Sequence, residues 1–160
     1  VMIRLVGGAL LVLFGILLAR HLAEREHRRV AYAEAYLDFL RYVRGELHAY
    51  ARPLGEVYRR CDHPVLEENG FLPALRAGVG IGDAARHTTP PTDPRAVKIL
   101  SDFGFAVGRG YLAETLACCD VYIERMNTYA GGVREAAPSR IRVRRTVALA
   151  GTALVLLLLL

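Results

Sequence analysis

Both ends of this chain are apolar runs with almost no charge, and they restrict its possible folds more than any other feature. Residues 1–19 contain one charged side chain, Arg4, and residues 146–160 contain none. All 16 acidic residues and 20 of the 21 basic residues lie between the two runs, in residues 20–145. That interior is long enough to form a small core of its own. We therefore expect three parts: two apolar ends and one polar domain.

The first run has the length of a membrane-spanning helix. Residues 1–19 would extend about 28 Å as an α-helix, close to the roughly 30 Å of the hydrocarbon core. Arg4 lies near the tip, where its long side chain can reach the headgroups. A cleaved signal peptide is the main alternative, but Ala19 is followed by Arg20 and no small-residue cleavage motif is present. We predict a retained transmembrane helix over residues 1–19.

The second run is shorter. Residues 146–160 would extend only about 22 Å, which spans a bilayer only if the bilayer thins or if Arg144 and Arg145 reach into the headgroup layer. A buried core helix is the alternative interpretation. A run that finishes with five consecutive leucines has no polar face to turn towards water. We therefore predict a second anchor, a C-terminal transmembrane segment over residues 146–160.

Arginine is concentrated beside the inner ends of both runs. The formal net charge is +5, with +2 in residues 20–29 and +4 in residues 134–145, whereas residues 30–133 carry −2. The basic residues therefore form no face for a nucleic-acid backbone. The positive-inside rule predicts that residues 20–145 form a cytoplasmic domain, with both termini in or across the cell membrane. Three cysteines, two of them adjacent, fit a reducing compartment.

The domain between the runs has the periodicity of helices. Two stretches, 22–50 and 111–137, carry apolar residues at alternating steps of three and four. These residues are Ala33, Tyr36, Leu40, Val43, Leu47 and Tyr50 in the first stretch, and Leu112, Leu116, Cys119, Ile123, Met126, Ala130, Val133 and Ala137 in the second. The predicted fold class is all-α: a membrane-anchored helical bundle with long antiparallel helices and an apolar anchor at each end.

Proline and glycine divide the rest of the domain. We expect the first long helix to break near Ala51–Arg52, and short helices to follow at 54–60, 72–77, 83–86 and 94–107. The sequence HTTPPTDP, residues 87–94, is typical of an exposed linker. Gly131-Gly132 and Pro138 should loosen or kink the end of the last soluble helix before the basic run.

No motif indicates chemistry. Cys61-Asp62-His63 offers metal-binding side chains but lacks a second cluster at the spacing of zinc ligands. Cys118 and Cys119 are adjacent, which is too strained for an ordinary disulfide. The glycine-rich residues 78–82 follow no strand and precede no Gly-Lys-Ser/Thr, so they predict a plain turn rather than a nucleotide loop. The sequence therefore predicts a protein that is not an enzyme, with no catalytic residue, cofactor, metal or small-molecule substrate.

The arrangement as a whole resembles a known family. The residues that carry the resemblance are Glu46-Leu47, Pro53-Leu54-Gly55-Glu56-Val57, Leu100-Ser101-Asp102-Phe103-Gly104 with Gly108, and Leu149-Ala150-Gly151 before the leucine-rich end. They resemble the stage III sporulation protein AB family of endospore-forming bacteria. Arg109-Gly110, Glu114 and Pro138 depart from the pattern of that family.

The resemblance implies a fold and a role. The domain would be similar to the cytoplasmic domain of the type II secretion platform protein GspF, a helical bundle without enzymatic activity. The protein would belong to a secretion-like complex in the mother-cell membrane, between mother cell and forespore. Its partners would be a cytosolic secretion-type ATPase, stage III sporulation protein AA, and other membrane proteins of the complex. The alternatives are a membrane-tethered thiol- or metal-dependent enzyme, and a generic membrane adaptor with no role in sporulation.

A docking surface for the ATPase is expected far from the membrane. If the two long helices pair antiparallel, the turns at 51–54 and 108–110 meet at the tip of the hairpin. The candidate partner-docking residues are Arg52, Pro53, Gly108, Arg109 and Gly110. Arg109, between two glycines, is expected to make a polar docking contact, although a solvated turn residue is the alternative interpretation.

Overall fold

The protein is all-α, as the sequence predicts. The computed structural model describes the backbone of residues 2–107 and 110–159 and the side chains of residues 13–107 and 110–153, and this part of the chain contains no strand. Its helices are α1 (Met2–Tyr50), α2 (Leu54–Arg60), α3 (Pro64–Glu68), α4 (Phe71–Arg76), α5 (Ile81–Arg86), α6 (Pro94–Ala106) and α7 (Leu112–Leu159).

The chain divides into two compact units, and both long helices contribute to each. Unit 1 contains residues 1–30 and 133–160, and unit 2 contains residues 31–132. The N-terminal part of α1 and the C-terminal part of α7 therefore belong to unit 1, and their remaining parts belong to unit 2. The two units are described separately below.

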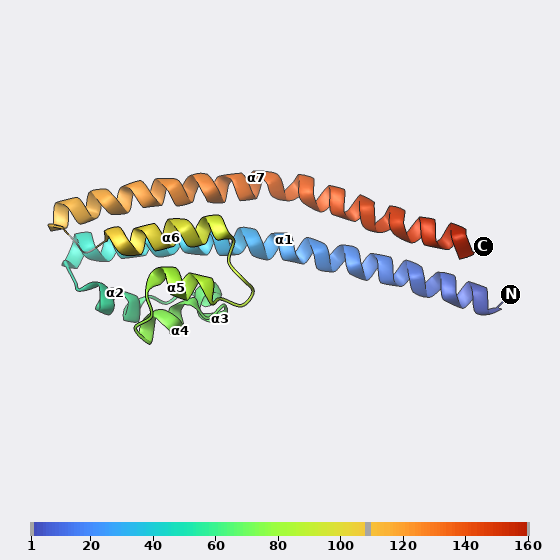
Figure 1. The fold of residues 1–160 in the computed structure, drawn as a ribbon, viewed down its shortest axis with the longest axis horizontal. Coiled ribbons are helices and arrows are strands. Elements are labelled where there is room, and N and C mark those ends of the chain that lie inside the picture. Colours follow the sequence, from blue (N-terminus) through green and yellow to red (C-terminus); the bar gives the residue numbers. More distant parts are fainter. Residues whose placement is uncertain (1, 108–109, 160) are drawn as a thin grey trace. The chain divides into compact units, whose positions relative to one another are not determined.

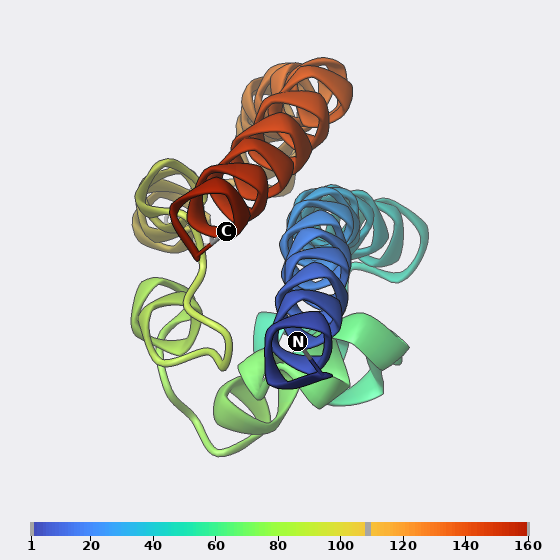
Figure 2. The same ribbon diagram turned by 90° about the vertical axis from the view of Figure 1, so that its right-hand side faces the viewer.

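The core of unit 2 is built around one face of α1. Tyr36, Phe39, Leu40 and Val43 are fully buried there, and Phe71 of α4 packs against two of them. The Phe71 ring meets the rings of Tyr36 and Phe39 edge to face, with centroids 5.2 Å apart in both pairs. Within unit 2, the short helices α2–α4 lie on the opposite side of α1 from α7 (Figures 1 and 2).

The predicted apolar stripes of both long helices are buried along most of their length. Cys119, Met126 and Ala130 of α7 are as deeply buried as the stripe of α1. The predictions are wrong at the loop ends of the stripes, where Tyr50 is 61% exposed and Leu112 is also exposed. Both residues lie in the last or first turn of their helix. Ion pairing between Arg44 and Asp120, 2.6 Å apart, joins the two helices at the surface of unit 2.

The predicted break after the first long helix is confirmed. Helix α1 ends at Tyr50, and Ala51 takes a left-handed conformation with φ of 48°. Its amide still donates to the carbonyl of Leu47, 3.0 Å away. Pro53 then precedes α2, which occupies the predicted residues.

Helix α6 also begins as predicted. Pro94 occupies its first turn, and the Asp93 carboxylate accepts a hydrogen bond of 2.9 Å from the amide of Arg95. The helices α4 and α5 lie within two residues of the predicted short helices. Helix α3 was not expected from the sequence; it has only five residues and begins directly at Pro64.

The prediction of an exposed linker over residues 87–94 is wrong in part. Thr88 is only 5% exposed, and Thr92 is half-buried. The Thr92 hydroxyl is hydrogen-bonded to the hydroxyl of Tyr36 at 2.6 Å and to that of Thr88 at 2.8 Å. Because Asn69 donates to Tyr36 and Thr88 donates to the Ala85 carbonyl, the four polar side chains form one continuous hydrogen-bonded chain. The segment is therefore held in place by buried polar side chains.

The sequence predicts that Gly131-Gly132 and Pro138 loosen or kink the end of the last soluble helix, and the helix does not unwind there. Helix α7 continues without interruption through Gly131, Gly132 and Pro138 to Leu159. A proline inside a helix removes one backbone hydrogen bond and costs about 3 kcal/mol, so neighbouring contacts have to compensate. Because Pro138 has no N–H group, the carbonyl of Arg134 loses its helical donor. The nearby residues Val133 and Ala137 are both buried.

In unit 1, α1 and α7 lie antiparallel. Gly15 is buried directly against Thr152, where a side-chain carbon would collide with the threonine hydroxyl. Glu26, eleven residues further along α1, contacts Arg144, eight residues earlier on α7. These two contacts run in opposite directions along the two helices, as an antiparallel pair requires.

Candidate functional site

The residues predicted to dock a partner fall into two groups. Gly108 and Arg109 lie outside the described residues. Arg52, Pro53 and Gly110 are described, and Pro53 and Gly110 are exposed. The turn at Gly110 is followed by Tyr111, whose amide donates to the Glu114 carboxylate at 3.3 Å.

Arg52 has contacts within the protein. Its guanidinium is 2.7 Å from the Glu46 carboxylate and 4.0 Å from that of Glu56, and it lies 4.2 Å from the centre of the Tyr50 ring. Because Glu46 is on α1 and Glu56 is on α2, Arg52 joins the two helices across the break. Its side chain is only partly exposed.

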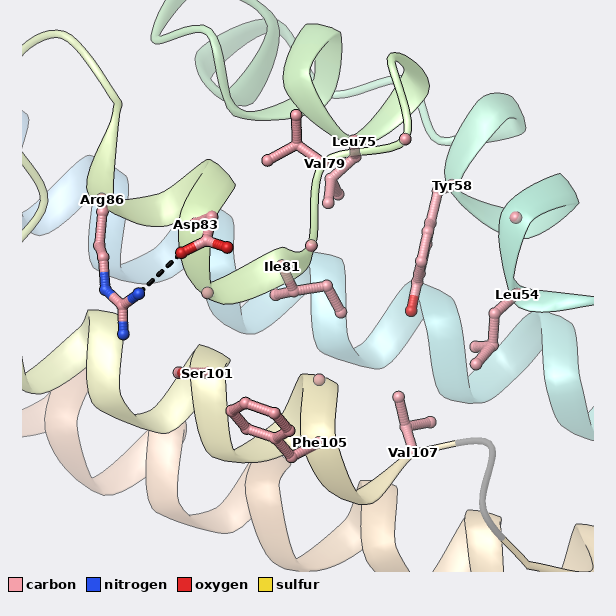
Figure 3. Close-up of a pocket in the computed structure, with 15 residues that line it drawn as sticks. Leu54, Tyr58, Leu75, Val79, Ile81, Asp83, Arg86, Ser101, Phe105 and Val107 are labelled. Carbon is pink, nitrogen blue, oxygen red and sulfur yellow. Dashed lines mark hydrogen bonds and ion pairs between the residues drawn. The ribbon is translucent and has the colours of Figure 1, made fainter.

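A groove of about 520 Å³ lies next to the predicted docking turns. Leu54 follows Pro53 directly, Val107 precedes Gly108, and both line the groove. Figure 3 shows Leu54, Tyr58 and Val107 towards one end and Asp83 and Arg86 at the other. The groove therefore begins beside both turns and continues between α2, α5 and α6.

Apart from Tyr58, Ser101 and one ion pair, the groove is lined by apolar side chains and glycines. Its glycines are Gly55, Gly78, Gly80, Gly82 and Gly104, and its apolar side chains include Leu75, Val79, Ile81 and Phe105. Phe105 is 64% exposed, which is unusual for so large an apolar side chain. Asp83 and Arg86 are the charged residues of the lining, and they pair with each other at 2.7 Å.

The structure explains why glycine occupies two of these positions. Gly78 has φ of 87°, a conformation that favours glycine. A side-chain carbon on Gly82 would lie 2.6 Å from the Ser101 hydroxyl and 3.0 Å from the Ser101 Cα, so Gly82 allows α5 to approach α6 closely. Residues 78–82, predicted as a plain turn, thus form one wall of the groove.

The groove also brings together two of the motifs that the sequence analysis singled out. Leu54 and Gly55 come from the first motif, and Ser101 and Gly104 come from the second. These segments are more than forty residues apart in the sequence. They meet because α5 packs on α6 while α4 packs on both α2 and α5.

The cysteines are poorly suited to nucleophilic chemistry. Burial raises the pKa of the Cys61 and Cys119 thiols to about 11, so both thiols are protonated at neutral pH. Burial also raises the pKa of Cys118, which is half-buried. Among the described residues, no group of three His, Cys, Asp or Glu side chains is arranged to hold a metal ion.

Unit 1 contains a buried charge that the sequence analysis missed. The side chain of Glu26 is 3% exposed, and its Oε1 lies 2.7 Å from Nη1 of Arg144. Its Oε2 lies 3.9 Å from Nη1 of Arg140, and neither of these two atoms has a hydrogen-bond partner. Glu26 lies seven residues before Ala33 and fourteen before Leu40, and so on the same face of α1. A pattern of apolar residues could not indicate that this position is buried, because Glu26 is charged.

The described end of the first run, residues 13–19, exposes apolar side chains over more than half of its circumference. The exposed residues of this part of α1 are Leu13, Phe14, Ile16, Leu17 and Leu18. At 3.6 residues per turn they cover an arc of about 200°, away from the buried Gly15. On α7, Val143, Val147 and Leu149 are exposed as well.

Within the part of the chain whose side chains are described, no helix is long and apolar enough to cross a membrane. Much of both predicted anchors, residues 1–12 and 154–160, lies outside that part. Comparison with known proteins gives no relative: no family model, curated protein or solved structure matches the chain.

Proposed function

We propose that this protein is a non-enzymatic membrane scaffold, anchored by its two apolar ends, whose helical domain docks a cytosolic partner. The observation that carries this proposal is the exposure of consecutive apolar side chains on α1. Phe14 is 63% exposed, and its neighbours Leu13, Ile16, Leu17 and Leu18 are exposed too. Water disfavours such a surface by about 25 cal/mol per Å² of apolar area, whereas hydrocarbon does not.

The distribution of arginine supports a cytoplasmic domain. Nine arginines lie in the stretches next to the inner ends of the runs: Arg20, Arg25, Arg28, Arg29, Arg134, Arg140, Arg142, Arg144 and Arg145. The outer flank of the first run offers only Arg4. Under the positive-inside rule this difference places residues 20–145 in the cytoplasm and both termini in or across the cell membrane.

The resemblance to the stage III sporulation protein AB family supports a more specific role. In this proposal the protein belongs to a secretion-like complex in the mother-cell membrane and couples a cytosolic secretion-type ATPase to membrane channel subunits. The groove fits this role better than the hairpin tip, because Arg52 is already paired with Glu46 and Glu56. The exposed Phe105 offers a partner an apolar contact of the kind that dominates docking energies.

A thiol-dependent enzyme is the less favoured alternative. A nucleophilic cysteine needs a lowered pKa, whereas burial raises the pKa of Cys61 and Cys119 to about 11.

The docking proposal is tested by binding of the ATPase encoded next to this gene to the full chain in lipid nanodiscs. Phe105→Glu should weaken binding at least about ten-fold, because a charge in an apolar contact is left desolvated. Val121→Glu is the matched control, since Val121 is an exposed apolar residue of α7 that does not line the groove. It should bind as the wild type does.

Two results would contradict the docking proposal. If Phe105→Glu binds as the wild type does while charge reversal of Arg142 and Arg145 abolishes binding, the docking surface lies in unit 1. If no ATPase gene or short membrane-protein genes lie next to this gene, the protein is a generic membrane adaptor.

A further inference from the structure

Unit 1 carries a set of outward-facing arginines directly beside its exposed apolar side chains. On α1 these are Arg20, Arg25 and Arg28, and on α7 they are Arg142 and Arg145. All five side chains are exposed. We call this set the arginine collar.

The collar forms one band because of the way α1 and α7 pair. The contact between Glu26 and Arg144 sets these residues at one level of unit 1. Arg25 and Arg28 are therefore close to the level of Arg142 and Arg145, and Arg20 lies nearer to the apolar ends. The band is about 12 Å long, which is eight residues of helix at 1.5 Å each. Successive collar arginines on each helix are at most five residues apart, which is about 7.5 Å along the helix axis and within the Debye length of about 8 Å at physiological salt.

Few acidic side chains are available to neutralise the collar. Residues 20–29 and 134–145 contain only Glu24, Glu26 and Glu135. The Glu26 carboxylate is buried against Arg144 and faces Arg140, so it offsets the charge of these two arginines and not that of the collar. The outward arginines consequently keep a positive field that a binding partner has to satisfy.

The neighbouring side chains indicate which anion fits. Exposed Leu17 and Leu18 of α1 precede Arg20, and exposed Val147 and Leu149 of α7 follow Arg145. An anionic lipid offers a phosphate beside hydrocarbon, and so matches both parts of this surface at once. A nucleic acid offers phosphates without hydrocarbon and would leave the apolar side chains uncovered.

We propose that the arginine collar binds the phosphate groups of anionic phospholipids in the leaflet at the inner ends of the two anchors. The proposal rests on the proposed function in one respect, that the apolar ends lie in a bilayer. Guanidinium groups bind phosphate through paired N–H donors, and clusters of four to eight basic residues beside a membrane segment select anionic lipids. Phosphatidylglycerol serves as the probe lipid.

The test places the full chain in phosphatidylcholine vesicles that contain a trace of spin-labelled lipid. Electron paramagnetic resonance measures the fraction of labelled lipid immobilised by the protein. Spin-labelled phosphatidylglycerol should be immobilised on the order of five-fold more than spin-labelled phosphatidylcholine at low salt, and the ratio should fall as salt is added.

The variants separate the collar from net charge. Replacing the five collar arginines by glutamine should abolish the preference for phosphatidylglycerol. The matched control replaces five exposed arginines of unit 2 by glutamine, namely Arg41, Arg59, Arg60, Arg95 and Arg125. It removes the same charge and should keep the preference. Replacing the five collar arginines by lysine keeps the charge and should retain most of the preference for phosphatidylglycerol. This variant shows whether the same five positions tolerate substitution when their charge is kept.

Each possible failure has a different meaning. Equal immobilisation of the two lipids, or a preference that survives the collar-to-glutamine change, overturns the collar proposal and leaves the membrane anchoring intact. No immobilisation of either lipid overturns the proposed anchoring, and the collar proposal with it. Binding of a short DNA duplex to the collar that displaces phosphatidylglycerol would assign the surface to nucleic acid instead.

Discussion

The two units of this protein are stabilised internally by different kinds of contact. Unit 2 has a core of aromatic and aliphatic side chains, and it contains a hydrogen-bonded chain of four polar side chains, Asn69, Tyr36, Thr92 and Thr88. Unit 1 has a buried carboxylate between two arginines, and it exposes apolar side chains at residues 13–18 of α1 and 143–149 of α7. The first arrangement is that of a protein in water. The second has its apolar surface on the outside, as expected for helices that continue into a lipid bilayer.

Removal of the central aromatic side chain of unit 2 should have the largest effect on stability. Phe71→Ala leaves a cavity beside Tyr36 and Phe39 and should lower the free energy of unfolding by about 3–5 kcal/mol. Chemical denaturation of the full chain in micelles, followed by near-ultraviolet circular dichroism of its tyrosines, measures this change. Phe105→Ala removes an exposed phenylalanine and should change the stability by less than about 0.5 kcal/mol. Similar losses for the two variants would contradict the described core.

Removal of the buried carboxylate should weaken unit 1 with an intermediate effect. Glu26→Ala leaves Arg144 without its partner, but that side chain is 42% exposed and can still be hydrated. We therefore expect a loss of about 1–3 kcal/mol, less than for a fully buried pair. Hydrogen exchange of the backbone amides of residues 20–30 should accelerate, whereas amides in the core of unit 2 should not. Glu24→Ala removes an exposed carboxylate and serves as the control; equal acceleration in that variant would rule out the role assigned to Glu26.

The hydrogen-bonded chain in unit 2 should contribute a smaller amount. Tyr36→Phe keeps the ring but removes the hydroxyl that bonds to Thr92 and accepts from Asn69. Because the Asn69 amide is then buried without an acceptor, we expect a loss of about 1–2 kcal/mol in the same denaturation experiment. Tyr111→Phe removes the hydroxyl of an exposed tyrosine and should be neutral. A neutral result for Tyr36→Phe would mean that residues 88–92 are not held by this network.

The buried thiols of unit 2 should make its stability depend on alkaline pH. Burial raises the folded-state pKa of Cys61 and Cys119 from 9.0 to about 11, so the folded state keeps their protons at pH values where the unfolded chain has lost them. The stabilisation is complete below pH 9 and is lost as the pH rises from about 9 to about 11. At pH 10 the loss should be about 1 kcal/mol for each thiol. Burial also raises the pKa of Tyr58, which adds in the same direction at higher pH.

Denaturation midpoints measured from pH 8 to 11 check this expectation. Replacing both cysteines by alanine should flatten most of the dependence below about pH 9.5, because the pKa of Tyr36 and Tyr58 in the unfolded chain is 10.0 and these tyrosines contribute mainly at higher pH. A slope that is unchanged in this double variant would assign the pH dependence to other groups.

The sequence was most informative where one residue type determines the local backbone. Asp93-Pro94 indicated the start of α6, and Pro53 with the preceding Ala51–Arg52 indicated the end of α1. The apolar stripes identified most of the core of unit 2, because burial of apolar side chains determines which face of a helix points inwards.

The sequence was less informative where polar side chains or glycines are buried by distant parts of the chain. Glu26 reads as one of many charges in a charged stretch, and Thr88 and Thr92 read as linker residues. Their burial depends on partners such as Arg144 and Tyr36, which lie more than fifty residues away. The groove was missed for the same reason, since Gly82 and Ser101 meet only after α5 packs on α6.

We propose that both ends are anchored in the membrane with residues 20–145 on the cytoplasmic side. Cysteine labelling at Thr89 tests it most directly, because Thr89 is exposed while its neighbour Thr88 is buried. The experiment uses Thr89→Cys in a chain that also carries Cys118→Ser, since the remaining Cys61 and Cys119 are buried. We expect to find the protein in the membrane fraction. An impermeant maleimide should not label the introduced cysteine in intact cells and should label it fully after lysis. Labelling in intact cells would contradict the claim.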